Sequence, residues 1–310
     1  MSEHSQVAVS VVVPVYGCRE CLGVLVDELA NVLSRTSRTF EIVLVDDGSP
    51  DNSWSEIRLL AEKNSFVRGI RFSRNFGQHA AIMAGLRASR GEVAVIMDCD
   101  MQDPPEVILR FLAALEHAEV AIGVRVGKKS AIRVFESRLF NRVMRVLTGT
   151  AIDNRQGGII GMTRKVIDNY CKIREVTNHL LFILRWLGFP HVEVEYERMP
   201  RHVGKSSYIL RKRIKHGLSG LLFESIRFFQ LIASIGVALA LAGFALTTLV
   251  VFRAVFYGSL SGWPSVISVL LVFFGITILL QAVVGGYVAK TFEQSRNRAM
   301  FVVSEDTSSS

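Results

Sequence analysis

Two short acidic segments carry the residue types best suited to chemistry in this chain. One is Asp46-Asp47-Gly48-Ser49, and the other is Asp98-Cys99-Asp100-Met101-Gln102. Residues i and i+2 of an extended chain point to the same side, so Asp98 and Asp100 converge, and Gln102 follows if the extension continues. Carboxylate and amide oxygens are hard ligands, which suit Mg²⁺ or Mn²⁺ shared with phosphate oxygens. The spacing therefore predicts a site for a divalent cation and a pyrophosphate group.

The surrounding sequence predicts elements that would position these segments. Short β-branched apolar runs alternate with stretches whose apolar residues recur three and four positions apart, as in strands alternating with helices. This order predicts an α/β fold with a mostly parallel sheet covered on both faces. We expect strands at 7–13, 41–45, 67–72, 93–97, 120–124 and 191–196, and helices at 20–33, 54–63, 78–89, 105–117, 132–147 and 178–187.

Both acidic segments follow predicted strands. Ligands of open parallel sheets bind beyond the carboxyl ends of the strands, where these segments fall. Each segment alone also fits a plainer role, as a turn or as helix-capping residues ahead of Pro104. Their joint occurrence at strand ends of one sheet favours the ligand site.

Charge is nearly absent from a long C-terminal part of the chain. No Asp, Glu, Lys or Arg occurs from Phe228 to Phe252, and only Arg253 interrupts the uncharged stretch up to Lys290. About 20 apolar residues in a helix cross a bilayer, so we expect membrane spans here, with buried core helices as the alternative. The expected order is a domain over 1–206, an amphipathic interface helix over 207–227, transmembrane helices over 228–252 and 266–289 joined by an external loop over 253–265, and a tail over 290–310, frayed from Ser304.

The basic residues predict how the chain is oriented. The chain carries 36 Lys and Arg against 28 Asp and Glu, a net charge of +8. Basic residues flank the two expected spans, so the positive-inside rule predicts a multi-pass protein of the cell (inner) membrane with its large domain and both termini in the cytoplasm. We expect no secretory signal, because the first apolar run is short and contains Pro14. Juxtamembrane basic charge favours lipid headgroups and the lipid bilayer over nucleic acid.

The cysteines predict neither a metal site nor a crosslink. Cys18 and Cys21 form a C-x-x-C pair without a second pair at metal spacing, so we expect no zinc site. We also expect no structural disulfide in a reducing cytoplasm.

Six segments, in order along the chain, closely resemble family 2 glycosyltransferases, and the resemblance covers nearly the whole chain, including Gly262-Trp263-Pro264-Ser265. The nearest branch is the polyprenyl-phosphate glycosyltransferases, the group of dolichol-phosphate mannose synthase and the bactoprenol glucosyltransferases. The segments are Val12-Val13-Pro14-Val15-Tyr16, Val45-Asp46-Asp47-Gly48-Ser49, Ser73-Arg74-Asn75-Phe76-Gly77, Met97-Asp98-Cys99-Asp100-Met101-Gln102-Asp103-Pro104-Pro105, Trp186-Leu187-Gly188-Phe189 and Gly204-Lys205-Ser206-Ser207-Tyr208.

The resemblance implies a GT-A (Rossmann-like) fold and a complete reaction. It implies inverting transfer of a single sugar from a UDP- or GDP-linked nucleotide sugar to polyprenyl (undecaprenyl or dolichyl) phosphate at the cytoplasmic membrane face, for cell-envelope glycan modification. It also implies a homo-oligomer, such as a tetramer, and Mg²⁺ or Mn²⁺ as cofactor. The implied residues are Pro14, Tyr16, Asp46, Asp47, Arg74 and Asp98 for the nucleotide sugar; Asp98, Asp100 and Gln102 for the metal; Arg125, Arg138, Arg201 and Ser206 for the lipid phosphate; and Asp100, Arg125 and Asp153 for catalysis.

Departures from the family pattern affect two parts of the implied site. After Tyr16 the family usually has Asn-Glu, where this chain has Gly17-Cys18. Gly158 stands where the family often has an acidic residue proposed as a base, and Asp153 is a nearby substitute. A phosphate monoester has its second pKa at about 6, so the acceptor oxygen is largely anionic at neutral pH and needs little help from a base. We therefore rank Asp100 above Asp153.

Two other functions stay open. A processive polysaccharide synthase would need more membrane spans for a polymer channel. A membrane scaffold that binds nucleotide sugar with little transferase activity would explain Gly158 and Cys18. The sequence does not identify the sugar, the nucleotide or the polyprenol length.

Overall fold

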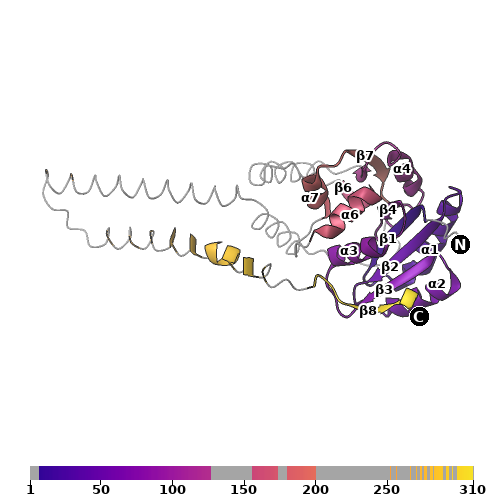
Figure 1. Ribbon diagram of the computed structural model, residues 1–310. Coiled ribbons are helices and arrows are strands. Elements are labelled where there is room, and N and C mark those ends of the chain that lie inside the picture. The colour runs from indigo at the N-terminus through magenta and orange to yellow at the C-terminus, as the bar shows by residue number, and fades with distance from the viewer. Residues whose placement is uncertain are drawn as a thin grey trace. The chain divides into compact units, whose positions relative to one another are not determined.

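The computed structural model describes residues 7–126, 156–173, 180–199 and 299–309, with scattered helical positions between 252 and 295. Within these ranges, eight strands form one sheet with helices on both faces (Figure 1). The chain divides into two compact units, of which the first comprises Met1–Lys129, Asp153–Lys205 and Arg298–Ser310 and the second comprises Ser130–Ile152 and Ser206–Asn297.

The sheet is mostly parallel, with the strand order β7-β5-β6-β4-β1-β2-β3-β8. Strands β1 to β4 run parallel to one another, and β7 runs parallel to β5. Strand β6 is antiparallel to both β4 and β5, and β8 is antiparallel to β3. The carboxyl ends of six strands therefore meet the amino end of β6 at one edge. The bounds are β1 Val9–Val15, β2 Phe40–Asp46, β3 Val67–Phe72, β4 Val93–Ile96, β5 Val120–Val126, β6 Gln156–Thr163, β7 His191–Glu197 and β8 Val303–Asp306.

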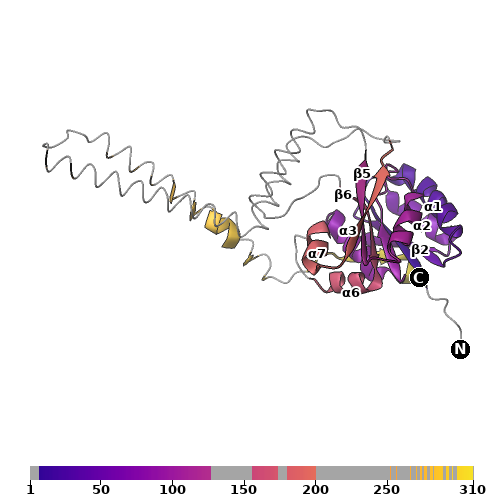
Figure 2. The ribbon, with the colours of Figure 1, turned by 90° about the horizontal axis from the view of Figure 1, so that it is seen from above.

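Helices cover both faces of the sheet: in Figure 2, α1 and α2 lie on one side of the strands and α3, α6 and α7 lie on the other. Successive side chains of a strand point to opposite faces of the sheet, so β1 contributes to two cores. Val11 and Val13 pack with α1, α2 and α4 on one face, whereas Val12 packs with α3, α6 and α7 on the other. A strand buried on both faces is mostly apolar, as the run from Val9 to Val15 is, and its polar residue Ser10 donates a hydrogen bond to Glu41. The helices are α1 Arg19–Ser34, α2 Ser53–Lys63, α3 Gln78–Ala88, α4 Val107–Ala114, α6 Arg164–Lys172 and α7 Leu180–Leu187.

The α/β architecture with a mostly parallel sheet is confirmed. The expected elements at 132–147 and 207–227 lie outside the described residues, as do all of 228–252 except Phe252 and 11 of the 24 positions in 266–289. No helix among the residues that the structure does describe has the length and apolar character needed to cross a membrane.

The glycine-rich segment after residue 155 is a strand, which its composition concealed. Ile159 joins the core under one face of the sheet, while Ile160 and Met162 join the core under the other. Strand β6 is therefore an interior strand buried on both faces, inserted between β4 and β5.

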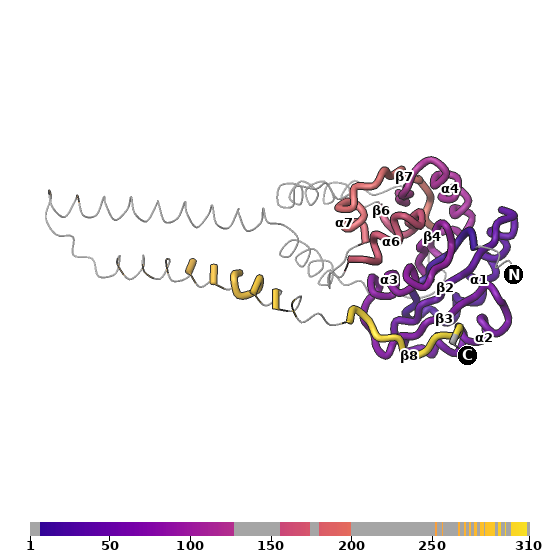
Figure 3. The backbone as a smooth tube through the Cα atoms, viewed as in Figure 1, coloured from indigo at the N-terminus to yellow at the C-terminus, as the bar shows by residue number. Residues whose placement is uncertain are grey.

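The expectation that the chain is frayed from Ser304 onward is wrong. Residues 303–306 form β8 along the outer edge of β3, and the yellow end of the chain in Figure 3 follows that path. The Asp306 carboxylate pairs with Arg68 at 2.7 Å (Nη2 to Oδ2), and Glu305 pairs with Arg71 at 2.7 Å. The Phe301 ring stacks on Phe72 with centroids 5.0 Å apart. Long-range pairing with β3, rather than local apolar content, holds this segment.

Candidate functional site

The aspartates that end β2 are buried and hydrogen-bonded to nearby backbone. The Asp47 carboxylate accepts the N–H of Phe76 at 2.6 Å and the N–H of Gly77 at 2.9 Å. Burial raises the pKa of Asp47, although these two hydrogen bonds act to lower it. Asp46 accepts the N–H of Ser49 at 2.9 Å. These contacts fix the turn after β2 and the segment after β3 against each other.

The residues predicted to hold a nucleotide sugar gather at the carboxyl ends of β1, β2 and β3. Pro14 lies within β1, and Tyr16 directly follows it with 55% of its surface exposed. The Arg74 guanidinium lies over the Phe76 ring, 4.1 Å from its centroid. Gly48 has a φ of +66°, and a Cβ there would lie 2.8 Å from the backbone of Arg74, so the two segments approach closely. The arrangement leaves an aromatic ring and a cation open to a ligand.

The segment that follows β4 forms a turn and is not extended. Residues 99 and 100 lie in a turn, and Met101 has a φ of +57°. The continued extension on which the alignment of Gln102 with the aspartates depended is therefore absent. Instead, the N–H of Gln102 donates to Asp100 Oδ1 at 3.3 Å. The turn itself groups these polar side chains.

Asp98 sits in a strongly negative environment. Gln78 donates to its Oδ1 at 2.8 Å. Burial and the neighbouring carboxylates of Asp103 and Asp100 raise the pKa of Asp98 to about 6, against the opposing effect of nearby arginines. A bound cation would offset this crowding of negative charge.

A disulfide joins Cys18 to Cys99, with Cα atoms 6.3 Å apart. The expectation of no structural disulfide, which was based on a reducing cytoplasm, is wrong. Strands β1 and β4 are adjacent and parallel, so the segments that follow them meet at the sheet edge. Cys21 and Cys171 are free thiols.

The structure adds Asp103, Tyr196 and Arg198 to the residues found from the sequence. Asp103 is almost fully buried, with Arg198 Nε 3.4 Å from its Oδ1 and Arg125 Nη2 3.8 Å from its Oδ2. Arg125 Nε also donates to the Tyr196 hydroxyl at 3.3 Å. Burial raises the pKa of Asp103, and the two arginines act against this rise. Arg198 follows a predicted strand, so the strand-end rule that identified Asp98 would have identified it as well.

Gly158 lies against this cluster, at the amino end of β6. Its φ is +90°, and a Cβ would lie 2.8 Å from Asp103 Oδ2 while also colliding with Arg125 and the Tyr196 hydroxyl. The space for a side chain at this position is therefore filled by the cluster.

The oxygen donors after β4 suit a divalent cation by their chemistry. Among the described residues, no three His, Cys, Asp or Glu side chains form a cluster able to hold a metal. The predicted set is different: the carboxylates of Asp98 and Asp100 with the amide oxygen of Gln102. Such a set fits Mg²⁺ or Mn²⁺ when phosphate oxygens and water complete the coordination.

Other predicted site residues lie outside the described part of the chain. These are Arg138, Asp153, Arg201 and Ser206.

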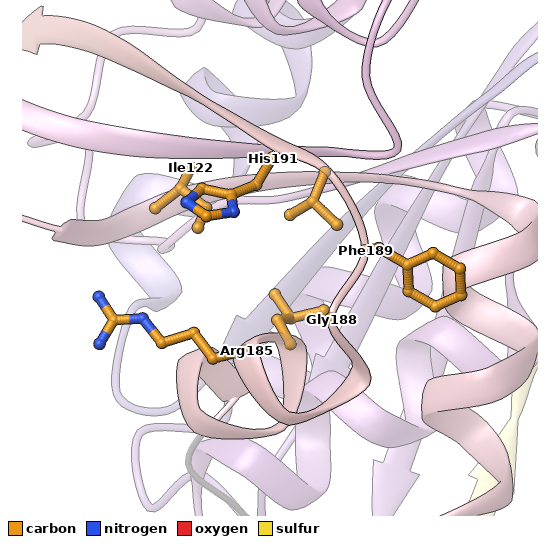
Figure 4. Close-up of a pocket in the computed structure, with 7 residues that line it drawn as sticks. Ile122, Arg185, Gly188, Phe189 and His191 are labelled. Atoms are coloured by element: carbon orange, nitrogen blue, oxygen red, sulfur yellow. The ribbon is translucent and has the colours of Figure 1, made fainter. Parts of the chain in front are cut away.

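A pocket of about 190 Å³ lies elsewhere in the fold. Figure 4 shows Arg185, Gly188, Phe189 and His191 around it together with Ile122. Val120 and His191 are the first residues of β5 and β7. This pocket therefore lies at the amino ends of these strands, opposite to the edge of the sheet that carries the turn of Asp98 and Asp100. We therefore do not assign the nucleotide to it.

A mostly parallel sheet with carboxylates and arginines gathered at its carboxyl edge defines an α/β protein built to bind an anionic ligand. The family model for glycosyl transferase family 2 matches residues 10–171, a range that contains the acidic turns after β2 and β4. The chain belongs to glycosyl transferase family 2, as the resemblance of its motifs predicted, and it is a glycosyltransferase.

Relatives align along almost the whole chain. An uncharacterized glycosyltransferase of Bacillus subtilis, YkcC, is 31% identical over 307 residues, which cover 98% of this chain and 94% of the relative. An undecaprenyl-phosphate 4-deoxy-4-formamido-L-arabinose transferase of Yersinia enterocolitica is 28% identical over 310 residues, covering 98% and 95%. Among solved structures, a mannosyltransferase of Pyrobaculum calidifontis aligns with a TM-score of 0.45 at 18% identity, covering 94% and 88%.

Proposed function

We propose that this protein transfers one sugar, with inversion, from a nucleotide-sugar donor to polyprenyl phosphate. The observation that carries the proposal is the grouping of Asp98, Asp100, Arg125 and Arg198 at the carboxyl edge of the sheet in a family 2 glycosyltransferase. Several full-length relatives are named as undecaprenyl-phosphate sugar transferases, which supports the lipid phosphate as acceptor.

The donor would lie across the ends of β1, β2 and β3. Tyr16 offers an exposed ring for the base, and the guanidinium of Arg74 offers positive charge nearby. Asp46 and Asp47 hold the turn that shapes this surface, since their carboxylates accept backbone N–H groups from both adjoining segments. Pro14 fixes the backbone direction at the end of β1.

Asp98, Asp100 and Gln102 would hold Mg²⁺ or Mn²⁺ at the donor diphosphate. A divalent cation there supplies electrostatic stabilisation of the leaving nucleoside diphosphate. Arg125 is oriented by the Tyr196 hydroxyl and by Asp103, and it would meet the acceptor phosphate. We propose that Arg138, Arg201 and Ser206 complete the lipid-phosphate site.

The reaction needs little general-base help. The acceptor phosphate is already largely anionic at neutral pH, because its second pKa is about 6. A side chain at position 158, where the family often has an acidic residue, would have to displace the ends of the Arg125, Tyr196 and Asp103 side chains. We therefore propose Asp100 as the essential carboxylate and Asp153 as a dispensable one.

A lipid acceptor would require the enzyme to lie at a membrane, and the uncharged C-terminal stretches would anchor it there. We propose that helices over 228–252 and 266–289 span the cell membrane, that the helix over 207–227 lies at its cytoplasmic face, and that the chain assembles into a homo-oligomer. Protease accessibility in oriented membrane vesicles tests the orientation, and native mass spectrometry tests the assembly. Protection of both termini in inside-out vesicles would contradict the orientation.

A transfer assay tests the reaction. Purified full-length protein is incubated with undecaprenyl phosphate, Mg²⁺ or Mn²⁺, and a panel of UDP- and GDP-sugars that includes nucleotide-linked 4-deoxy-4-formamido-L-arabinose, the sugar in the names of several relatives. Lipid mass spectrometry should show one sugar added per lipid, lost in Asp100→Asn and retained in Asp153→Asn.

Other outcomes would overturn the proposal. Long-chain products would favour a processive synthase. Nucleotide-sugar binding without lipid product from any donor would favour the scaffold. Loss of turnover in Asp153→Asn with nucleotide binding intact would reverse the ranking of the two aspartates.

A further inference from the structure

Arg198 is held beside the acidic turn by the backbone and not only by its charge. It directly follows β7, whose residue Tyr196 is the register partner of Arg125 on β5. The next backbone N–H, that of Met199, donates to the carbonyl oxygen of Gln102 at 2.8 Å. Arg198 is thus fixed next to the proposed metal ligands whatever its side chain contacts.

The side chain of Arg198 bridges two carboxylates of different character. Its Nε lies 3.4 Å from Oδ1 of Asp103, and its Nη2 lies 3.8 Å from Oδ2 of Asp100. Asp103 is 1% exposed, and both of its carboxylate oxygens are buried. Asp103 is therefore a buried anion that needs cations, whereas Asp100 lies nearer to solvent and to the proposed ligand.

The four charged groups alternate in sign: Arg125, Asp103, Arg198 and Asp100. Both contacts of Arg198 are longer than a normal hydrogen bond, and 32% of its side-chain surface is exposed. Its donors are therefore not consumed by Asp103, and the guanidinium has a face available for a further anion. A planar guanidinium is well suited to bind phosphate oxygens through paired N–H groups.

We propose that Arg198 is a diphosphate-binding residue that changes partner: it neutralises Asp100 in the free enzyme and moves to the donor diphosphate when a divalent cation occupies Asp100. A cation held by Asp100 would compete with the guanidinium for this carboxylate. Phosphate oxygens brought in by the cation provide the replacement partner, while Asp103 keeps the base of the guanidinium in place. This inference rests on the proposed function, since it takes the metal and diphosphate from there.

The partner change predicts opposite effects on two affinities. Arg198→Gln removes the cation that competes at Asp100, so Mn²⁺ alone should bind several-fold more tightly. The same substitution removes a charged donor to phosphate, so Mn²⁺ should bind about tenfold or more weakly in the presence of UDP or GDP. A purely structural role, in which Arg198 only neutralises Asp103, would lower both affinities together.

Electron paramagnetic resonance of free Mn²⁺, titrated with purified full-length protein, measures both affinities without turnover. Arg198→Lys keeps the charge but not the paired donors. Mn²⁺ alone should therefore bind this variant as weakly as it binds wild type. In the presence of UDP or GDP, the Mn²⁺ affinity of this variant should lie between those of wild type and Arg198→Gln. Arg38→Gln is the control, because Arg38 forms a surface ion pair with Glu116 at 2.7 Å. Arg38→Gln should change neither affinity.

The outcomes separate this inference from the proposed function. Wild-type protein that binds no Mn²⁺ with either nucleotide would contradict the proposed function. Wild-type binding with both affinities unchanged, or lowered together, in Arg198→Gln would overturn the partner change alone. If Arg198→Gln does not fold, the Arg198→Lys titration decides: an unchanged affinity in the presence of nucleotide overturns the inference.

Discussion

The Sγ atoms of Cys18 and Cys99 are bonded to each other, which ties the segment after β1 to the centre of the turn that carries Asp98 and Asp100. The two cysteines are 81 positions apart in the chain. They meet because β1 and β4 are neighbours in the sheet. The crosslink therefore restrains the proposed metal-binding turn against the proposed nucleotide surface.

Removal of this crosslink should destabilise the domain. In the chain-entropy account, a loop of this length stabilises the folded state by about 4 kcal/mol, so Cys18→Ser and Cys99→Ser should each lower the free energy of unfolding by up to that amount. Denaturant unfolding of the full-length chain measures it. Cys21→Ser, which removes a free thiol three positions after Cys18, is the control. Equal stability of all variants would show that the crosslink does not form.

Restoring an acidic residue at position 158 should impair the enzyme. In Gly158→Asp or Gly158→Ala, the new Cβ would collide with Arg125 and the Tyr196 hydroxyl. We expect transfer activity to fall at least tenfold in either variant, because Arg125 loses its position. Gain of activity in Gly158→Asp would mean that the family's acidic residue can act here after all.

Gly157→Ala is the matched control for Gly158→Ala. Both glycines have positive φ, +111° and +90°, so each alanine should cost about 1–3 kcal/mol of backbone strain. Only Leu181 Cδ1, at 3.9 Å, lies near a Cβ at position 157. Thermal unfolding should therefore report a loss of stability in both variants, larger in Gly158→Ala, while activity should fall much further in Gly158→Ala.

Asp47 should contribute both to the stability of the fold and to the binding of the nucleotide. Asp47→Asn replaces a carboxylate that accepts two backbone N–H groups, so we expect a loss of about 2 kcal/mol in the free energy of unfolding. Displacement of the Arg74 segment should weaken UDP or GDP binding in isothermal titration calorimetry. Asp27→Asn, at an exposed position of α1, controls for the lost charge. Unchanged nucleotide affinity in Asp47→Asn would contradict the positioning role.

The Asp306 carboxylate of strand β8 should make the free energy of unfolding decrease as the pH becomes acidic. Burial alone would raise the pKa of Asp306, but hydrogen bonds from Arg68 and Ser308 outweigh it and lower this pKa to about 2. A lowered carboxylate pKa contributes stability above the unfolded pKa of about 4, and this contribution is lost as the pH falls toward 2. Asp306→Asn should therefore cost about 1–2 kcal/mol at pH 7 and almost nothing near pH 2.

Unfolding of wild type and Asp306→Asn at a series of pH values measures this difference. Glu305→Gln is a useful comparison, because the side chains of Arg71 and Glu305 are 39% and 44% exposed, more than those of Arg68 and Asp306, and the pair should contribute less. A difference between wild type and Asp306→Asn that did not shrink in acid would exclude the ion pair as its source.

The sequence by itself determined the α/β class and most elements through β5. Apolar periodicity reports whether a local segment is extended or helical and which faces it buries, so the runs around Val11 and Ile42 were readable without a partner. The same rule located Asp46, Asp47, Asp98 and Asp100, because polar residues that directly follow buried strands of a parallel sheet share one edge.

Only the tertiary structure decided which distant residues meet. The Cys18–Cys99 bond, the contacts of Arg198 with Asp100 and Asp103, and the lack of space at Gly158 all depend on the strand order β7-β5-β6-β4-β1. Local pattern carries no information about that order. Strands β6 and β8 escaped prediction for a related physical reason, because glycine and polar residues form strands there only through pairing with β4, β5 and β3.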